Sequence, residues 1–300
     1  MDVVIGLGEA GCKIADQFAK YPQYKIYKID VGLESLNDLD GLVYDEVQED
    51  NVKTFSMPIE LSSEDYEKNC PPMKDFFTEL KAGDNVLFVM AGGGKIAGAS
   101  LRILETIKHC NLSILYLKPD LQLIGGKKYI LDRISYYVMQ EYARSGMFNR
   151  MYLTYNPSVE NAIGDVAVKG YFDELNNMVV STHHMINVFD NTESVFENKS
   201  EPEEHVRITT YGIVNPETGE ERLFFPLENI TDKTYYIAVN KEVLEDKKFF
   251  KELKENMKKK AEQQGVGISY VINETEYEDS YVYVVAHSDE PQGEEALKKI

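Results

Sequence analysis

The chain has 300 residues, of which 43% are apolar, and it carries a formal net charge of −19. This length predicts one large or two medium domains, and the apolar content is sufficient for a buried core. The acidic balance disfavours nucleic acid and anionic membranes as partners, because like charges repel.

Cysteine usage and the N-terminus predict a cytoplasmic protein. Cys12, Cys70 and Cys110 are odd in number, widely separated and without a CxxC pair, so neither a disulfide framework nor a zinc site is predicted. The five histidines show no metal-ligand spacing, and no metal site is predicted. No apolar run reaches the ~18–20 residues of a membrane span, and no basic leader precedes the first predicted strand.

Predicted strands and helices alternate through the first half of the chain. Hydrophobic periodicity predicts strands at 2–5, 25–29, 86–90, 112–117 and 151–155, and helices at 12–20, 72–81, 101–107 and 127–143. This order is typical of an α/β domain with a Rossmann-like, mostly parallel sheet. Ligands of such sheets bind at the carboxyl ends of the strands.

A glycine motif follows the first strand, Gly6-Leu7-Gly8-Glu9-Ala10-Gly11. This GxGxxG pattern, with Asp30 ending the next strand about 20 residues later, is typical of a dinucleotide-binding unit. The motif is weak alone, and Asp30 is equally explained as the cap of a strand end. Cys12, at a helix start, is either a thiol of lowered pKa or a small packing residue.

A second glycine cluster lies between the strand at 86–90 and the helix at 101–107, and its sequence is Ala91-Gly92-Gly93-Gly94-Lys95-Ile96-Ala97-Gly98-Ala99-Ser100. Backbone without Cβ atoms can close its N–H groups around an anion, and a helix N-terminus adds a favourable dipole. The spacing is not that of a Walker A loop. The alternative is that these glycines only permit a tight turn. Asn156 follows a later strand at the same predicted edge.

The second half of the chain differs in character. Five strands are predicted at 208–214, 222–227, 235–239, 268–272 and 281–286, with a helix at 245–263 and a turn at 216–219 that makes the first two strands a hairpin. The predicted organisation is a nucleotide-binding domain at 1–169, a central helix at 170–190, a loop or linker at 191–207, a smaller α+β domain at 208–288 and a flexible tail at 289–300.

The order and spacing of these pieces resemble the tubulin/FtsZ superfamily over about residues 2–210. Residues 6–11 are similar to the family's first nucleotide loop, and residues 92–100 to its GGGTGTG/S signature. Lys118-Pro119 stands where FtsZ-like chains carry Lys-Pro, and residues 171–177 resemble the part of the central helix that holds guanine. The resemblance implies a GTP-binding protein, a possible GTPase, that forms head-to-tail homopolymers.

The resemblance also implies which residues bind GTP or GDP. Backbone at 8–12 and 93–98 would hold the phosphates, Asp30 and Asn156 would approach the ribose, and Phe172 with Asn176 would hold the base. The full predicted set is Gly8, Glu9, Ala10, Gly11, Cys12, Asp30, Gly92, Gly93, Gly94, Lys95, Ile96, Ala97, Gly98, Asn156, Phe172 and Asn176.

The chain departs from the family pattern at positions that matter for hydrolysis. Lys95 and Ala97 replace the two signature threonines, and Lys95 either contacts phosphate or points to solvent. Residues 124–129 lack the ribose-contacting acid and arginine. The synergy loop, which supplies an acid to the neighbouring subunit's nucleotide, has no clean match.

Three acids are candidates for that catalytic role, with Mg²⁺ as the implied companion ion: Asp190, Glu201 and Glu203. The alternative is that they only solvate a loop. Slow or absent hydrolysis is therefore expected. Two other functions stay open: a non-dynamic structural or interaction protein of the same fold with a vestigial nucleotide site, and a Rossmann dinucleotide-dependent enzyme, which would leave the cluster at 92–100 unexplained.

Overall fold

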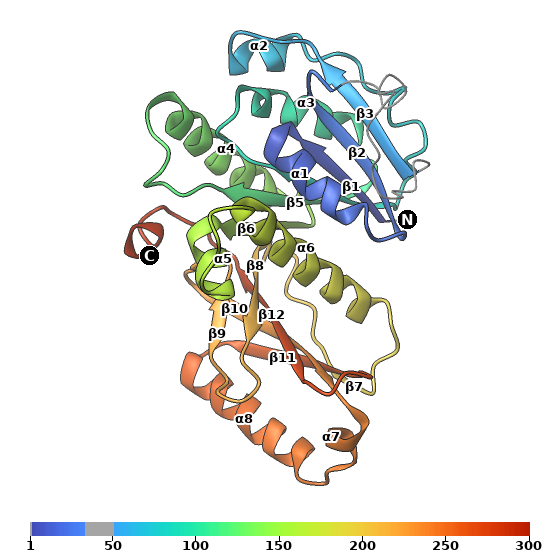
Figure 1. The fold of residues 1–300 in the computed structure, drawn as a ribbon, viewed down its shortest axis with the longest axis vertical. Coiled ribbons are helices and arrows are strands. Elements are labelled where there is room, and N and C mark those ends of the chain that lie inside the picture. Colours follow the sequence, from blue (N-terminus) through green and yellow to red (C-terminus); the bar gives the residue numbers. More distant parts are fainter. Residues whose placement is uncertain (1, 34–50) are drawn as a thin grey trace. The chain divides into compact units, whose positions relative to one another are not determined.

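A computed structural model describes residues 2–33 and 51–300, and the chain divides into two compact units, Met1–Asn156 and Pro157–Ile300 (Figure 1). In the described part of the first unit every strand pairing is parallel, and the strand order is β3-β2-β1-β4-β5-β6. The strands are β1 (Asp2–Leu7), β2 (Tyr24–Val31), β3 (Val52–Met57), β4 (Asn85–Met90), β5 (Asn111–Lys118) and β6 (Arg150–Tyr155). This is a doubly wound order, and the predicted α/β class is confirmed.

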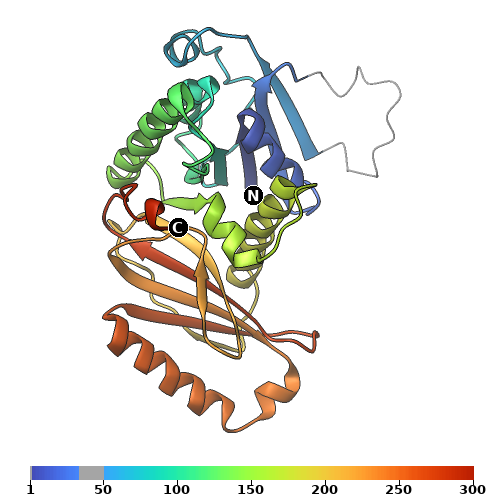
Figure 2. The ribbon, with the colours of Figure 1, turned by 60° about the vertical axis from the view of Figure 1, so that its left-hand side comes forward.

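Helices cover both faces of this sheet. The helices of this unit are α1 (Gly8–Phe18), α2 (Ser63–Lys68), the 3-10 helix η3 (Lys95–Ala99), α3 (Ser100–Thr106) and α4 (Gly126–Arg144). Among them, α1 contacts β1, β2 and β4, and α4 contacts β5 and β6. Figure 2 shows α1 on one side of the sheet and α4 on the other. Right-handed crossovers require this, because the chain moves along the sheet in one direction from β1 to β2 and in the other from β4 to β5. Strands covered on both faces read as unbroken apolar runs, and residues 86–90 of β4 are all buried.

The helix predicted at 72–81 is wrong. Residues 74–79 form successive turns, with single hydrogen bonds such as that from the Leu80 N–H to the Phe77 carbonyl. Phe76 and Phe77 both pack on the Tyr27 ring, with centroid distances of 5.3 and 5.4 Å. Neighbouring residues of a helix point about 100° apart, so a helix would direct only one of these rings at Tyr27.

The second unit holds α5 (Asn156–Ile163), whose first residue ends the first unit, and α6 (Tyr171–Asp190), where a long helix is predicted. Its sheet has the order β8-β12-β10-β11-β7, with β9 beside β8. The strands are β7 (Phe196–Asn198), β8 (Ile208–Val214), β9 (Glu221–Leu223), β10 (Ile230–Val239), β11 (Gly267–Glu274) and β12 (Tyr281–Ser288), and the remaining helices are α7 (Lys241–Glu245) and α8 (Phe249–Gln264).

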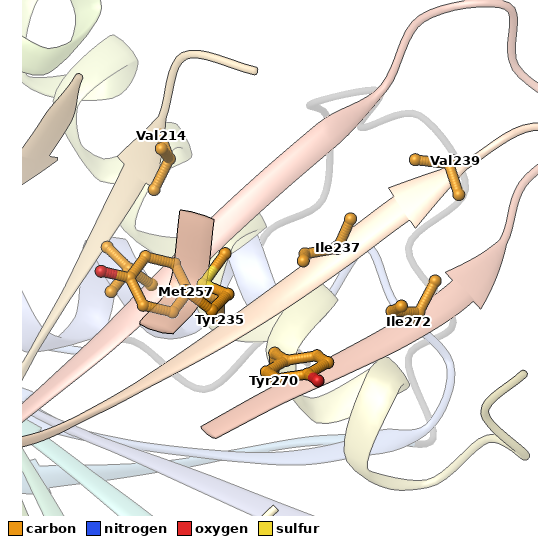
Figure 3. Close-up of a cluster of buried hydrophobic side chains, with 8 residues drawn as sticks. Val214, Tyr235, Ile237, Val239, Met257, Tyr270 and Ile272 are labelled. Atoms are coloured by element: carbon orange, nitrogen blue, oxygen red, sulfur yellow. The ribbon is translucent and has the colours of Figure 1, made fainter. Parts of the chain in front are cut away.

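The two faces of β10 pack against different helices. Tyr235, Ile237 and Val239 point to one face and join a buried cluster that includes Met257 of α8 (Figure 3). Tyr236 points to the other face, where its ring lies 5.7 Å from that of Phe189 on α6. Alternation along a strand produces this division, so the sheet has an apolar core on each side.

Two predicted elements of the second unit differ in extent from the observed ones, and a third is observed as predicted. The strand predicted at 222–227 is observed only over Glu221–Leu223, and Phe224 and Phe225, both fully buried, follow its end. The predicted hairpin of β8 with β9 is confirmed. The helix predicted at 245–263 is divided into α7 and α8 where the Asp246 carboxylate accepts the Lys248 N–H at 2.9 Å, a local bond that competes with the helix.

The segment predicted as a flexible tail makes side-chain contacts in the second unit. Gln292 is only 2% exposed, and its side-chain oxygen accepts the Glu228 N–H at 2.7 Å. Its amide nitrogen donates to the Glu228 carbonyl at 3.2 Å. These bonds tie the segment to the loop that precedes β10.

Candidate functional site

The carboxyl edge of the first unit's sheet collects most of the predicted binding residues. In the parallel registers Leu7 is level with Ile29 and Met90, and Lys118 is level with Tyr155. The segments that follow these strands therefore emerge along one edge. They carry Gly8, Asp30, the cluster at 92–98, the loop before α4 and Asn156. The structure thus places these groups along one edge, which is where ligands of such sheets bind.

The first glycine loop is a direct passage from β1 into α1, which begins at Gly8 and not at Cys12 as predicted. A Cβ at Gly6 would lie 2.4 Å from the Gly11 carbonyl oxygen, and a Cβ at Gly11 would lie 2.5 Å from that of Val89. Gly8 has a φ of +71°, which favours glycine. Gly6 and Gly11 are thus needed for close packing of helix on strand, and Gly8 for the turn. No side chain caps this helix N-terminus.

Cys12 is a packing residue. Its Sγ is buried and lies 3.5 Å from the Gly6 carbonyl oxygen and 3.7 Å from that of Ile29. Burial, together with the negative charge of Asp30, raises the pKa of this thiol to about 12. The thiol is therefore protonated at neutral pH, and the alternative of a lowered pKa is wrong.

Asp30 is bound to its own strand end. Its Oδ1 accepts the Val31 N–H at 2.8 Å, which supports the strand-end interpretation of this residue. Burial raises the pKa of the carboxyl, and the nearby negative charge of Glu9 raises it further. Glu9 is exposed and pairs with Lys13 at 2.7 Å. The edge thus carries two acids beside the first loop.

The glycines of the second loop differ in what surrounds them. A Cβ at Gly92 would lie 2.1 Å from the Tyr116 hydroxyl, and one at Gly98 would lie 2.0 Å from the Ser63 carbonyl oxygen. These two glycines are required for packing. At Gly93 and Gly94 the nearest described atoms would be 3.7 and 3.8 Å away, and neither residue has a positive φ.

Nothing in the described part of the chain therefore demands glycine at positions 93 and 94. A missing side chain there leaves the backbone N–H groups open to approach from outside. This arrangement fits a phosphate-binding loop.

A third segment at this edge, which is not among the predicted binding residues, also has features suited to an anion. Helix α4 starts at Gly126 after Gly125, without a side-chain cap and without an acid in its first turn. Lys128 in that turn lies against the second loop, since a Cβ at Gly93 would be 3.7 Å from the Lys128 carbonyl oxygen. The sequence signal was present in Gly125-Gly126-Lys127-Lys128, two glycines and two lysines at a helix start.

Positive side chains gather at these loops on an otherwise acidic protein. Lys95, Lys127 and Lys128 are exposed. The pKa of Glu9 is lowered by its hydrogen bond to Lys13 and by the charge of Lys13, and the charge of Lys128 lowers it further. Local cations of this kind favour an anionic ligand against the global field.

The base-binding candidates lie in the second unit. Phe172 and Asn176 are four residues apart on α6 and therefore share one face of the helix. Phe172 is 55% exposed, and its ring packs edge-on against Tyr171 with the centroids 5.1 Å apart. An exposed aromatic ring of this kind is suited to stacking on a planar ligand.

The three candidate catalytic acids have different surroundings. Asp190 ends α6, and its Oδ1 lies 2.7 Å from Lys199 Nζ and accepts the Tyr236 hydroxyl at 2.9 Å. Glu201 shares the same lysine at 3.6 Å. Burial lowers the pKa of Lys199, but the hydrogen bond and charge of Asp190 outweigh this effect and raise the pKa overall. Glu203 is 82% exposed at its side chain and lies 3.4 Å from His205 Nδ1.

Two further observations concern the described residues as a whole. Residues 2–33 and 51–300 contain no group of three or more His, Cys, Asp or Glu side chains placed to hold a metal ion. Within the same ranges no helix combines the length and the apolar character that crossing a bilayer requires.

No protein-family model matches the chain, and no curated protein matches it in sequence. Solved structures do match its fold. TubZ from Bacillus thuringiensis serovar israelensis, in GDP-form protofilaments, gives a TM-score of 0.70 at 14% identity over 99% of this chain and 89% of that one. CetZ2 from Haloferax volcanii, in a GTPγS-bound protofilament, gives 0.69 at 13% identity over 99% and 95%. An empty FtsZ dimer from M. jannaschii gives 0.66 at 10% identity over 98% and 88%. The likeness thus spans both units.

Proposed function

Because the chain has the tubulin/FtsZ-like fold, we propose that it is a cytoplasmic guanine-nucleotide-binding protein that assembles head to tail into filaments. The observation that carries the proposal is the open backbone at Gly93 and Gly94. Close contact in the described chain does not require glycine at either position, and both lie at the edge where α/β sheets bind ligands.

The phosphates of the nucleotide would be held by three segments. Backbone N–H groups at 93–95 and at the uncapped N-terminus of α1 would donate to phosphate oxygens, and the uncapped N-terminus of α4 adds its dipole. Lys95 directly follows this backbone in sequence, and the Lys128 backbone lies against Gly93. Lys95 would compensate for the missing signature threonine. Asp30 and Asn156 are proposed at the ribose, and Phe172 with Asn176 at the guanine.

We expect hydrolysis to be slow or lost. Glu203 is the candidate acid whose side chain is most exposed, at 82% against 74% for Glu201 and 38% for Asp190. Mg²⁺ would be held through the phosphates of the nucleotide, because the described residues offer no protein cluster for it. If hydrolysis occurs it requires the next subunit, and its rate per subunit then rises with protein concentration.

The proposal of a filament rests on the fold and on symmetry. Several matching structures are protofilaments, of TubZ and of CetZ2. A head-to-tail contact that does not close into a ring generates an open polymer. The partner proposed for this chain is therefore another copy of itself.

One observation favours a second candidate, a non-dynamic structural protein with a vestigial nucleotide site. Glu9 and Asp30 place two carboxylates beside the first loop, where they oppose an anionic ligand. A dinucleotide-dependent enzyme, the remaining alternative, would use the first loop and leave the open backbone of the second without a purpose.

Sedimentation tests the proposal directly. The purified chain is centrifuged at high speed after incubation with GTP, with GDP or without nucleotide, and nucleotide binding is measured in parallel by isothermal titration. Pelleting that depends on GTP above a critical concentration supports a nucleotide-gated filament. Equal pelleting in all three conditions without binding supports the vestigial site. Binding without pelleting contradicts the filament, and neither binding nor pelleting contradicts the whole proposal.

A further inference from the structure

A fully buried ion pair lies directly behind the second glycine loop. Lys118 Nζ, at the end of β5, is 2.6 Å from Asp132 Oδ2 on α4, and both side chains are 0% exposed. The Tyr116 hydroxyl donates to Asp132 Oδ1 at 2.9 Å and lies 3.0 Å from the Asp132 carbonyl oxygen. Lys118 Nζ also lies 4.2 Å from the centre of the Tyr136 ring.

Stability alone does not explain this pair. Burying two charges costs more free energy of desolvation than burying two apolar side chains of similar volume. For this reason, replacing a buried ion pair by apolar residues is often neutral or stabilising. What a short charge-assisted hydrogen bond does provide is a defined geometry, because it fixes two groups at one separation and one orientation. Here the two groups belong to β5 and α4, so the pair fixes the helix on the strand.

The second loop is fitted against this same stretch of α4. A Cβ at Gly92 would lie 2.1 Å from the Tyr116 hydroxyl, 2.8 Å from Ser135 Cβ and 2.9 Å from Asp132 Cα. One residue on, Gly93 faces Lys128. Asp132 is six residues into α4, about 9 Å along the axis from its N-terminus. A shift of α4 therefore moves the loop and the helix start together.

We propose that Lys118 and Asp132 are positioning residues, which hold α4 on β5 so that the N–H groups of the 92–94 loop and of the α4 N-terminus point at one anion. This inference rests on the proposed function, in that the anion is taken to be the phosphates of a guanine nucleotide. Neither side chain touches the ligand, because both are enclosed. Their effect is on the placement of groups that do.

The double variant Lys118→Met with Asp132→Leu tests the proposal. It removes both charges together, preserves approximate side-chain volume, and leaves the Tyr116 hydroxyl the backbone carbonyl of position 132 as acceptor. We expect a folded protein with an unfolding midpoint near that of the wild type and GTP affinity about tenfold weaker, as when supporting residues behind a binding group are removed. A pair without a positioning role would leave the GTP affinity unchanged, whatever the effect of the double variant on the unfolding midpoint.

A control variant and a second readout keep the outcomes distinct. Ile26→Val on β2, buried and away from β5, lowers stability without touching α4 and is expected to bind GTP as the wild type does. Amide hydrogen exchange without nucleotide should be faster in the double variant alone at residues 130–134 of α4, whose N–H groups are the first to be hydrogen-bonded within the helix.

The outcomes separate this inference from the proposed function. If the wild type binds GTP and the double variant matches it in affinity and in exchange, the positioning role is wrong. If the wild type does not bind GTP, the proposed function fails, and the exchange rates of α4 alone decide whether the pair holds this helix in place.

Discussion

Gly98 of η3 and Ser63 of α2 are in direct backbone contact, so closely that a Cβ on Gly98 would lie 2.0 Å from the Ser63 carbonyl oxygen. Gly93, five residues earlier in the same loop, has no described atom within 3.7 Å of the corresponding point. The two positions are thus matched in residue type and opposite in surroundings, which makes them a pair for mutagenesis.

Gly98→Ala is expected to destabilise the protein by about 1–3 kcal/mol, because the methyl group must displace backbone. Gly93→Ala is expected to leave the urea unfolding midpoint close to that of the wild type and to weaken GTP binding. Urea titration and isothermal titration of both variants check this. Equal GTP affinity in Gly93→Ala and wild type would favour the vestigial site.

The acid stability of the second unit should depend on Glu221. Its carboxylate lies 2.7 Å from Lys233 Nζ, contacts Lys260, and accepts the Tyr235 hydroxyl at 2.7 Å. Burial raises the pKa of Glu221, but the hydrogen bonds from Lys233, Lys260 and Tyr235 outweigh it and lower the pKa from 4.5 to about 2.

A carboxyl whose pKa is lower in the folded than in the unfolded state binds fewer protons in the folded state at pH values between the two pKa values. Its contribution to stability is therefore complete above pH 4.5 and is lost as the pH falls towards about 2. Glu221→Gln should be less stable at pH 7, because Lys233 and Lys260 lose the negative charge that faces them, and should show a flatter decline between these pH values. Urea unfolding of both proteins across this range measures it, and parallel pH profiles would count against the assignment.

Native thiol labelling should discriminate among the three cysteines. Cys12 and Cys110 are buried, while Cys70 is half-buried. Burial raises the pKa of all three thiols, that of Cys12 to about 12. With a disulfide reagent at pH 8 we expect Cys70 to react first and Cys12 to react only after unfolding. Cys70→Ser should remove the early phase, and rapid labelling of Cys12 in that variant would contradict the packing described here.

Substitutions of the candidate catalytic acids should change the stability of the protein to different extents. Asp190→Asn weakens the contacts to Lys199 and Tyr236, and we expect a loss of about 1–3 kcal/mol in the free energy of unfolding. Glu203→Gln lies on the surface and should stay within about 0.5 kcal/mol of the wild type. If the filament hydrolyses GTP, phosphate release per unit of pelleted protein should fall in Glu203→Gln and not in the matched variant Glu204→Gln. The opposite order would exclude Glu203.

Much of the fold was predictable because its signals are local. Residues 86–90 are an apolar run, and covered parallel strands read as such runs. The glycine clusters mark the strand-to-helix passages correctly, and α6 was predicted within one residue of its bounds. β3 and α2 were missed, since β3 has five of its six residues only half-buried or exposed and α2 is a short polar helix.

The candidate site was harder to predict, because the same residue type serves two purposes. Gly92, Gly93, Gly94 and Gly98 are indistinguishable in sequence, and only their neighbours in space show that the first and last are needed for packing. Asp132 gave no signal at all. It is one acid in a helix, and its partner Lys118 is 14 residues away on a different element.

The strand order of the second unit has a consequence for synthesis on the ribosome. β12 is the last strand of this sheet to be translated, yet it lies between β8 and β10 and pairs antiparallel with both. Until residues 281–288 have emerged, β8 and β10 each expose a long unpaired edge on a nascent chain. Such edges are prone to mispairing between neighbouring chains on a polysome. The second unit therefore completes its fold only late in translation, whereas every strand of the first unit has already been made when β6 is complete.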